Sequence, residues 1–160
     1  MTAPNGANGA NERCLGRFTE WYRRTPVAFE FWEVLVTDRR MIGCRVGESF
    51  KSMLLRADMG ERGREAIADL SPDKLVTSDR QLITVPTESL RRVHLQRGGL
   101  ARRAVLTIEW DPINGEDSSP LELYNTRRGD PQVGLVETLA DDDRLSHLTV
   151  SIDEPCFALF

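Results

Sequence analysis

The clearest structural signal in this chain is the segment Trp32-Glu-Val-Leu-Val-Thr-Asp-Arg-Arg-Met-Ile-Gly-Cys-Arg-Val46. It contains most of one apolar run, Phe29–Val36, and all of a second run, Met41–Val46. Aromatic and β-branched residues of this kind favour strands. The polar residues Thr37-Asp-Arg-Arg40 between the runs have the composition of a turn. The pattern therefore predicts a β-hairpin.

Later segments have the composition of strands as well: Leu82–Val85, Leu90–Gln96, Ala104–Trp110 and Leu121–Tyr124. The side chains of Ala104–Trp110 alternate between two faces along the whole segment, which is the strand period. Asn114-Gly115 is a turn signal in the polar loop that follows. Phe18–Arg24 has aromatic residues at mixed spacing and fits either a short helix or an irregular strand.

Helical composition is found in two parts of the chain. Gly60–Leu70 favours one helix, and Ser71 followed by Pro72 is typical of the start of another. We expect residues 49–78 to form a helical insertion between strands. Near the end, Pro131–Leu139 fits a helix with Asp130 as its cap. The order of these segments predicts a mainly β (α+β) protein.

Two segments resemble prokaryotic pleckstrin-homology-like (PH-like, GRAM-like) domains. Val34-Leu-Val-Thr-Asp-Arg-Arg-Met-Ile42 is similar to an apolar strand of that family that runs into a Thr-Asp-Arg-Arg corner. Ile83-Thr-Val-Pro-Thr-Glu-Ser-Leu-Arg-Arg-Val-His-Leu95 is similar to its strand, polar link and second short strand. The resemblance covers residues 29–140, and the helical insertion departs from it.

The resemblance implies a strongly bent antiparallel barrel or sandwich whose open end is covered by a C-terminal capping helix. With 160 residues the chain has the size of one domain. We expect a flexible N-terminal tail (1–12), a single PH-like domain (13–144) and a C-terminal strand-like apolar tail (145–160). No apolar run approaches the length of a membrane span and no signal pattern is present, so a cytoplasmic location is expected.

The residue inventory gives no reason to expect an enzyme. Cys14, Cys44 and Cys156 are far apart in the sequence and show no metal-ligand spacing. The two histidines, His94 and His147, have no such neighbours either, and no nucleophile-elbow or phosphate-loop pattern occurs. We therefore expect no catalytic residue, no metal and no cofactor.

PH-like domains mostly bind lipids, peptides or partner proteins, so the resemblance implies a non-catalytic binding or adaptor module. In members that bind phosphoinositides, basic residues near the first hairpin hold the headgroup. The matching candidates for a lipid or anion site here are Arg39, Arg40, Arg45 and Lys51. Prokaryotic relatives generally lack the headgroup pattern, which favours protein–protein contacts over a peripheral membrane adaptor.

Other residues are candidates for partner contact. Residues 1–105 hold 18 basic and 13 acidic side chains, whereas residues 106–160 hold 3 and 12. The basic candidates are Arg91, Arg92, Arg97, Arg102 and Arg103, which would also serve the minor alternative of nucleic-acid binding. The apolar candidates are Phe157, Leu159 and Phe160 in the tail. This tail either packs on its own domain or adds a strand to a partner or a second copy.

Overall fold

The computed structural model describes residues 12–50, 58–99, 102–117, 119–126 and 132–153. The strands are β1 (Cys14–Arg24), β2 (Ala28–Thr37), β3 (Arg40–Phe50), β4 (Leu82–Pro86), β5 (Leu90–Gln96), β6 (Val105–Trp110), β7 (Leu121–Asn125) and β8 (Thr149–Asp153). The helices are α1 (Glu61–Ile67), α2 (Pro72–Val76) and α3 (Val133–Asp141). None of the helices in these ranges has the length and apolar character needed to cross a membrane.

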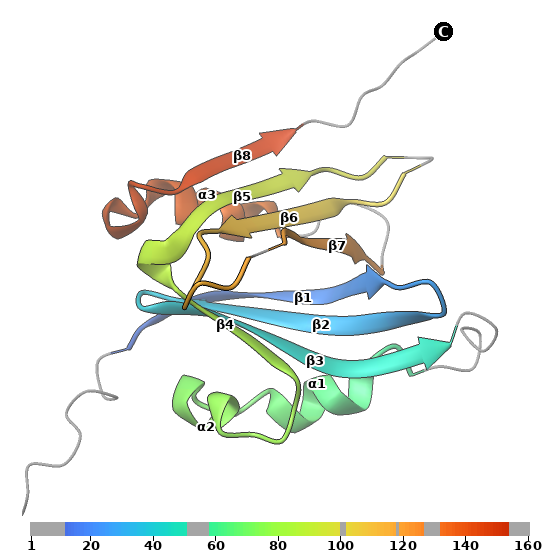
Figure 1. Ribbon diagram of the computed structural model, residues 1–160. Helices are drawn as coiled ribbons and strands as arrows, with labels where there is room; N and C mark the ends of the chain where they lie inside the picture. The colour runs from blue at the N-terminus through green and yellow to red at the C-terminus, as the bar shows by residue number, and fades with distance from the viewer. Residues whose placement is uncertain (1–11, 51–57, 100–101, 118, 127–131, 154–160) are drawn as a thin grey trace, which may run out of the picture.

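All eight strands belong to one sheet, in the order β4-β3-β2-β1-β7-β6-β5-β8. Neighbouring strands are antiparallel except for β5 and β8, which are parallel. Strand β4 forms one edge of the sheet and β5 lies beside the other edge, yet only the 3₁₀ turn Thr87–Ser89 separates them in the chain. The sheet therefore curls so that its two ends approach each other, and two groups of strands are visible (Figure 1).

The concave side of the sheet encloses the larger core, which we call the inner core. Strands β1–β7 all contribute to it, with Phe18, Trp21 and Trp32 among its largest fully buried side chains. Helix α3 packs into it through Val136 and Leu139. Burial of this much apolar surface is the main favourable term for the fold.

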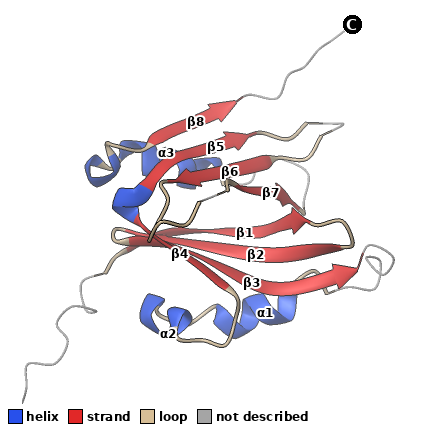
Figure 2. Cartoon of the chain, viewed as in Figure 1, coloured by secondary structure: helices blue, strands red, loops and turns tan. Residues whose placement is uncertain are grey.

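A second, outer core lies on the opposite side of β1–β4. Helices α1 and α2 cover this side with Ile67 and Leu75, and α3 lies on the other side of the sheet (Figure 2). Helix α1 approaches the backbone of β3 very closely at Gly63, where a Cβ atom would lie 1.9 Å from the carbonyl oxygen of Val46. The same approach brings Gly60 next to Gly47.

The mainly β composition and the strand positions predicted from the sequence are confirmed. Phe18–Arg24 is a strand, part of β1, and its mixed spacing has a structural cause. The strand register shifts between Phe18 and Trp21, and Glu20 within this bulge has φ 68°. The extra residue turns both aromatic side chains toward the inner core.

The helical insertion begins later than expected, because β3 continues to Phe50 and the first described helix starts at Glu61. Gly47 lies within the strand, paired with Phe31, since the close approach of α1 requires a residue without a side chain there. The predicted start of α2 is confirmed: the Ser71 hydroxyl accepts a hydrogen bond from the Lys74 N–H.

The sheet extends past the expected domain boundary at residue 144. Thr149–Asp153, which the sequence analysis assigned to the C-terminal tail, forms β8 beside β5. Val150 and Ile152 pack against the inner core, and this packing holds the strand on its own domain. Phe157, Leu159 and Phe160 lie outside the described residues.

Helix α3 starts at Val133, two residues after the expected start, and Asp130 and Pro131 lie outside the described residues. Its N-cap position is Gln132, in the left-handed conformation with φ 60°. The Gln132 Oε1 atom accepts hydrogen bonds from the Thr19 N–H (2.8 Å) and from the indole N–H of the fully buried Trp21 (2.9 Å). Its Nε2 donates to the carbonyl of Arg17. One amide side chain therefore joins α3 to β1.

We expect Gln132→Gly to destabilise the protein by about 1–2 kcal/mol. Glycine suits φ 60° and relieves the strain there, but the indole N–H of Trp21 and the N–H of Thr19 lose their acceptor, and buried unsatisfied donors are costly. Urea unfolding measures the effect. Glu137→Ala, an exposed change in the same helix, is the control and should stay within about 0.5 kcal/mol of the parent. A Gln132→Gly protein as stable as the parent would contradict this role.

Candidate binding face of the sheet

The outer side of β7, β6, β5 and β8 is not covered by any described helix. The outer core contains side chains of β1–β4, α1 and α2, and Tyr124 of β7 packs against its margin, but it contains none of β5, β6 or β8. Helix α3 lies on the inner side of these strands, where it packs into the inner core (Figure 1). We call the uncovered side of these four strands the open face.

Strand pairing places the side chains of the open face in rows across the sheet. One row runs from the β8 edge toward the outer core in the order Asp153, Gln96, Val105, Tyr124, Tyr22. The neighbouring row consists of Ser151, His94, Thr107 and Glu122. Arg92 and Glu109 follow in the next row, beside Thr149. The open face therefore changes from polar at β8 to aromatic at β7.

The aromatic end of the open face is a cluster of two tyrosines and two arginines. The rings of Tyr22 and Tyr124 stack with their centroids 5.8 Å apart. The Arg24 guanidinium lies 4.1 Å from the ring centre of Tyr124, and that of Arg103 lies 5.9 Å from Tyr22. The Tyr124 hydroxyl donates a 2.5 Å hydrogen bond to Glu122, which is the main reason that the pKa of Tyr124 is raised.

The polar end contains His94 between two residues of β8. Its Nδ1 lies 2.6 Å from the Ser151 hydroxyl and its Nε2 lies 3.1 Å from an Asp153 carboxylate oxygen. The residue types match a serine-hydrolase triad, but the geometry is reversed, since in such triads the carboxylate binds Nδ1 and the serine lies at Nε2. The Asp153 side chain is also 66% exposed. These contacts join β5 to β8 at the edge of the sheet.

Two of the four anion candidates near the first hairpin, Arg40 and Arg45, are already engaged by carboxylates. Arg40 forms hydrogen bonds with both carboxylate oxygens of Glu12, each 2.9 Å long, and with Asp73 at 2.8 Å. The hydrogen bond to Glu12 is the main reason that the pKa of Arg40 is raised. Arg39 is exposed beside it, and Lys51 lies outside the described residues. Arg40 thus ties the residues before β1 and helix α2 to the hairpin.

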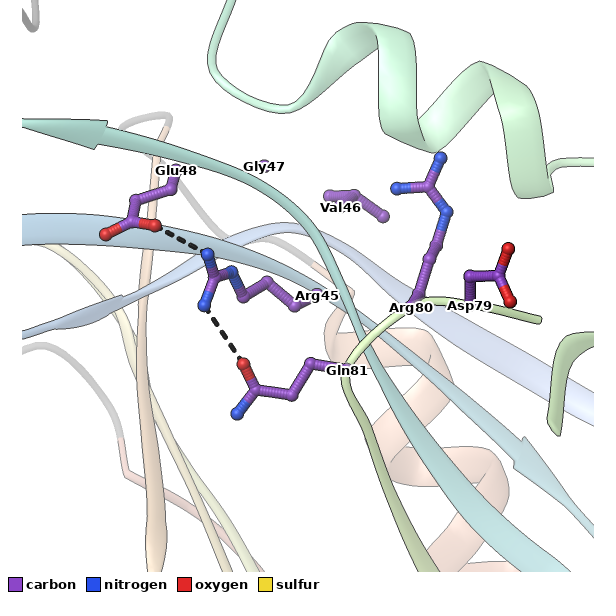
Figure 3. A pocket seen from close by; sticks show the side chains of 7 residues that line it. All are labelled: Arg45, Val46, Gly47, Glu48, Asp79, Arg80 and Gln81. Atoms are coloured by element: carbon purple, nitrogen blue, oxygen red, sulfur yellow. Dashed lines mark hydrogen bonds and ion pairs between the residues drawn. The ribbon is translucent and has the colours of Figure 1, made fainter. Parts of the chain in front are cut away.

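Arg45 lines an open pocket of about 440 Å³ together with Val46, Gly47, Glu48, Asp79, Arg80 and Gln81 (Figure 3). Its guanidinium bonds to Glu48 at 2.5 Å and to the Gln81 amide oxygen at 3.0 Å, and it lies 3.4 Å from Glu30. The side chain of Arg80 points away from this group (Figure 3). Two arginines and two acids line the pocket, so its charge is balanced rather than suited to an anion.

The five later arginines do not form one cluster. Arg91 and Arg92 lie at the start of β5, whereas Arg97, Arg102 and Arg103 lie at the opposite end of the β5–β6 hairpin. Arg91 is paired with Asp111, and Arg103 donates to the carbonyls of Asn125 (3.1 Å) and Thr126 (2.7 Å). Arg92 and Arg97, the nearest members of the two groups, are five residues apart along β5, which is about 17 Å.

Sequence reasoning named Arg103 as a partner-contact candidate but missed the other members of the tyrosine–arginine cluster, Tyr22, Arg24 and Tyr124. Tyr22 and Tyr124 come from strands that are far apart in the chain and pair only through the register of β1 with β7. One usable signal was present, because Glu122 and Tyr124 alternate with the apolar Leu121 and Leu123 and must face the other side of the strand.

A search of protein-family models, of curated proteins and of solved structures finds no match to this chain. The chemistry of the open face is therefore the basis for a functional assignment.

Proposed function

We propose that this protein is a non-catalytic PH-like binding module that acts through protein–protein contacts on its open face. The architecture supports the PH-like part of the proposal. Seven strands, β1–β7, form antiparallel pairs in a curled sheet, and the helix that follows them, α3, packs into the concave side. The resemblance in the sequence implied an arrangement of this kind.

The observation behind the choice of partner is an uncovered sheet face with mixed chemistry. Arg24, Arg103 and Tyr124 offer the residue types that dominate the energy of protein interfaces. Arg92, Glu109 and Glu122 place charges of both signs on the same face. A protein surface can complement such a mixture, whereas a polyanion would meet the carboxylates of Glu109, Glu122 and Asp153.

Contacts that already exist within the protein count against lipid binding and against nucleic-acid binding. A lipid headgroup at the first hairpin would have to displace Glu12 from Arg40 and Glu48 from Arg45. A nucleic-acid base that stacked on Tyr124 would have to displace Arg24 or Tyr22 from its ring. Protein contacts require neither change.

The test uses a matched pair of threonines on strands of the same sheet. Thr107 lies at the centre of the open face between His94 and Glu122, whereas Thr84 lies on β4, away from that face. Proteins retained from a native extract are quantified for the parent, Thr107→Lys and Thr84→Lys. We expect Thr107→Lys to reduce retention of the specific partner about tenfold or more, a cost of about 1.4 kcal/mol, with Thr84→Lys unchanged.

Equal retention by both variants would place the contact surface elsewhere. Anionic vesicles should sediment no more of the parent protein than neutral vesicles do. Clear enrichment on anionic vesicles, together with unchanged partner retention, would favour the membrane alternative.

A further inference from the structure

Among the described residues, strand β8 is an unpaired edge of the sheet. It pairs with β5 on one side, and no described strand or helix pairs with its other side, where it forms the outer margin of the fold (Figure 1). Natural edge strands are often protected by proline, by lysine or another charged residue, by a bulge or by short length. The five-residue strand β8, Thr-Val-Ser-Ile-Asp, has Asp153 at its end but contains no proline or lysine, and its register with β5 is unbroken. The opposite edge, β4, ends in Pro86.

One hydrogen bond of the β5–β8 ladder determines which backbone groups of β8 point outward. The Arg97 N–H donates to the Asp153 carbonyl at 3.0 Å. In a parallel pair, alternate residues point both backbone groups toward the same neighbour. Thr149, Ser151 and Asp153 therefore bond to β5. The N–H and C=O groups of Val150 and Ile152 point outward, and among the described residues they have no partner.

We propose that a second copy of this chain pairs with this edge, β8 against β8, antiparallel about a two-fold axis at Ser151. In that register Val150 faces Ile152 of the second copy and Ile152 faces its Val150. Each pair exchanges two backbone hydrogen bonds, so all the outward groups of both strands are satisfied. This proposal rests on the proposed function, because it names a second copy of the chain as one protein partner of the module.

Charge favours a second copy over an arbitrary extended peptide. In this register Asp153 faces the neutral Thr149 of the second copy, and the next residue in that row is Arg92 of the second copy. Arg92 is exposed and has no ion pair with any residue in the described ranges. Two strand spacings of about 4.8 Å separate it from Asp153, a distance that an arginine side chain spans. Symmetry repeats this pairing, and no like charges oppose each other.

The interface is built from two five-residue strands and is small. Small, open interfaces are typical of weak complexes. We therefore expect a dimer whose dissociation constant is on the order of 10–100 µM. The open faces of the two copies would form one continuous surface across the two-fold axis.

The two-fold axis at Ser151 gives a charge-swap test. Ser151→Lys places two like charges opposite each other, and so does Ser151→Glu, whereas an equimolar mixture of the two variants places opposite charges together. Sedimentation equilibrium at concentrations from about 5 to 500 µM measures mass. We expect the parent to approach twice the 18.1 kDa of one chain, each variant to stay near 18.1 kDa, and the mixture to return to the dimer. Thr84→Lys, at the other edge, should dimerise as the parent does.

Thr149→Arg provides a second test, in which the proposal requires dimer affinity to increase rather than to decrease. It would face Asp153 of the second copy and tighten the dimer several-fold. A parent that stays monomeric over the whole range overturns the proposal. So does a dimer that Ser151→Lys leaves intact, or a mixture that fails to associate.

These outcomes are separate from those of the proposed function. A monomeric parent whose partner retention still depends on Thr107 leaves the binding module standing and removes only the second copy. A dimer with the charge-swap behaviour, but with equal retention by Thr107→Lys and Thr84→Lys, supports the second copy and removes the open face as the binding surface for other proteins.

Discussion

Replacing Gly63 with alanine is expected to destabilise the protein by about 2–3 kcal/mol and to lower Tm by about 5–10 °C. A Cβ atom at this position would lie 1.9 Å from the carbonyl oxygen of Val46 and 2.7 Å from its carbonyl carbon. These are backbone atoms of β3 and cannot rotate away as a side chain could. Alanine gains up to about 1 kcal/mol in helix propensity, but the displacement of α1 from β3 outweighs it.

Gly134→Ala is the matched control for this prediction. Gly134 also lies in a helix, α3, but a Cβ atom there would have no neighbour within 4 Å. The propensity gain then acts alone, and we expect Gly134→Ala to stabilise the protein by a few tenths to about 1 kcal/mol. Thermal and urea unfolding of both variants give the comparison. If Gly63→Ala stabilised the protein as Gly134→Ala does, the close packing of α1 on β3 would be wrong.

The same packing shows why glycines limited the prediction from sequence. The runs of aromatic and β-branched residues were enough to find the strands around Trp32, because β2 is buried at nearly every position and its apolar residues are nearly continuous. A glycine such as Gly47 usually indicates the end of a strand. Here it lies within β3, because the backbone before α1 packs closely on it and leaves no room for a side chain. Helix α1 was predictable from its own composition. Its position was not, because the sequence of Glu61–Ile67 does not indicate which surface of the sheet the helix covers.

The candidate site was less predictable than the fold for a related reason. A sequence shows the arginines but not the carboxylates that other segments bring to them, such as Glu12 at Arg40 and Glu30 at Arg45. Closeness in sequence also misled for Arg91 and Arg103, which a hairpin holds at opposite ends. For β8 the strand pattern was visible, but its parallel pairing with β5 depends on the whole sheet.

The helical insertion is joined to the sheet by an ion pair as well as by packing, and this contact gives the second large effect. The Glu33 side chain is 2% exposed, and its Oε1 accepts from Arg64 Nε at 2.6 Å and from the Thr19 hydroxyl at 2.8 Å. Its Oε2 is buried and accepts no hydrogen bond within the described residues. Within the described ranges Arg64 is the cation that pairs with this carboxylate, and the buried charge depends on it.

We therefore expect Arg64→Met to cost about 3 kcal/mol in urea unfolding, because methionine keeps most of the aliphatic packing but leaves the buried charge of Glu33 unpaired. Adding Glu33→Gln should restore most of that loss. The amide removes the charge and still offers an oxygen to the Thr19 hydroxyl and the Glu20 N–H. The double variant should then be more stable than Arg64→Met alone, a non-additivity expected for two residues in direct contact. Costs that simply add would show that Arg64 stabilises the protein through packing, and that the charge on Glu33 does not depend on it.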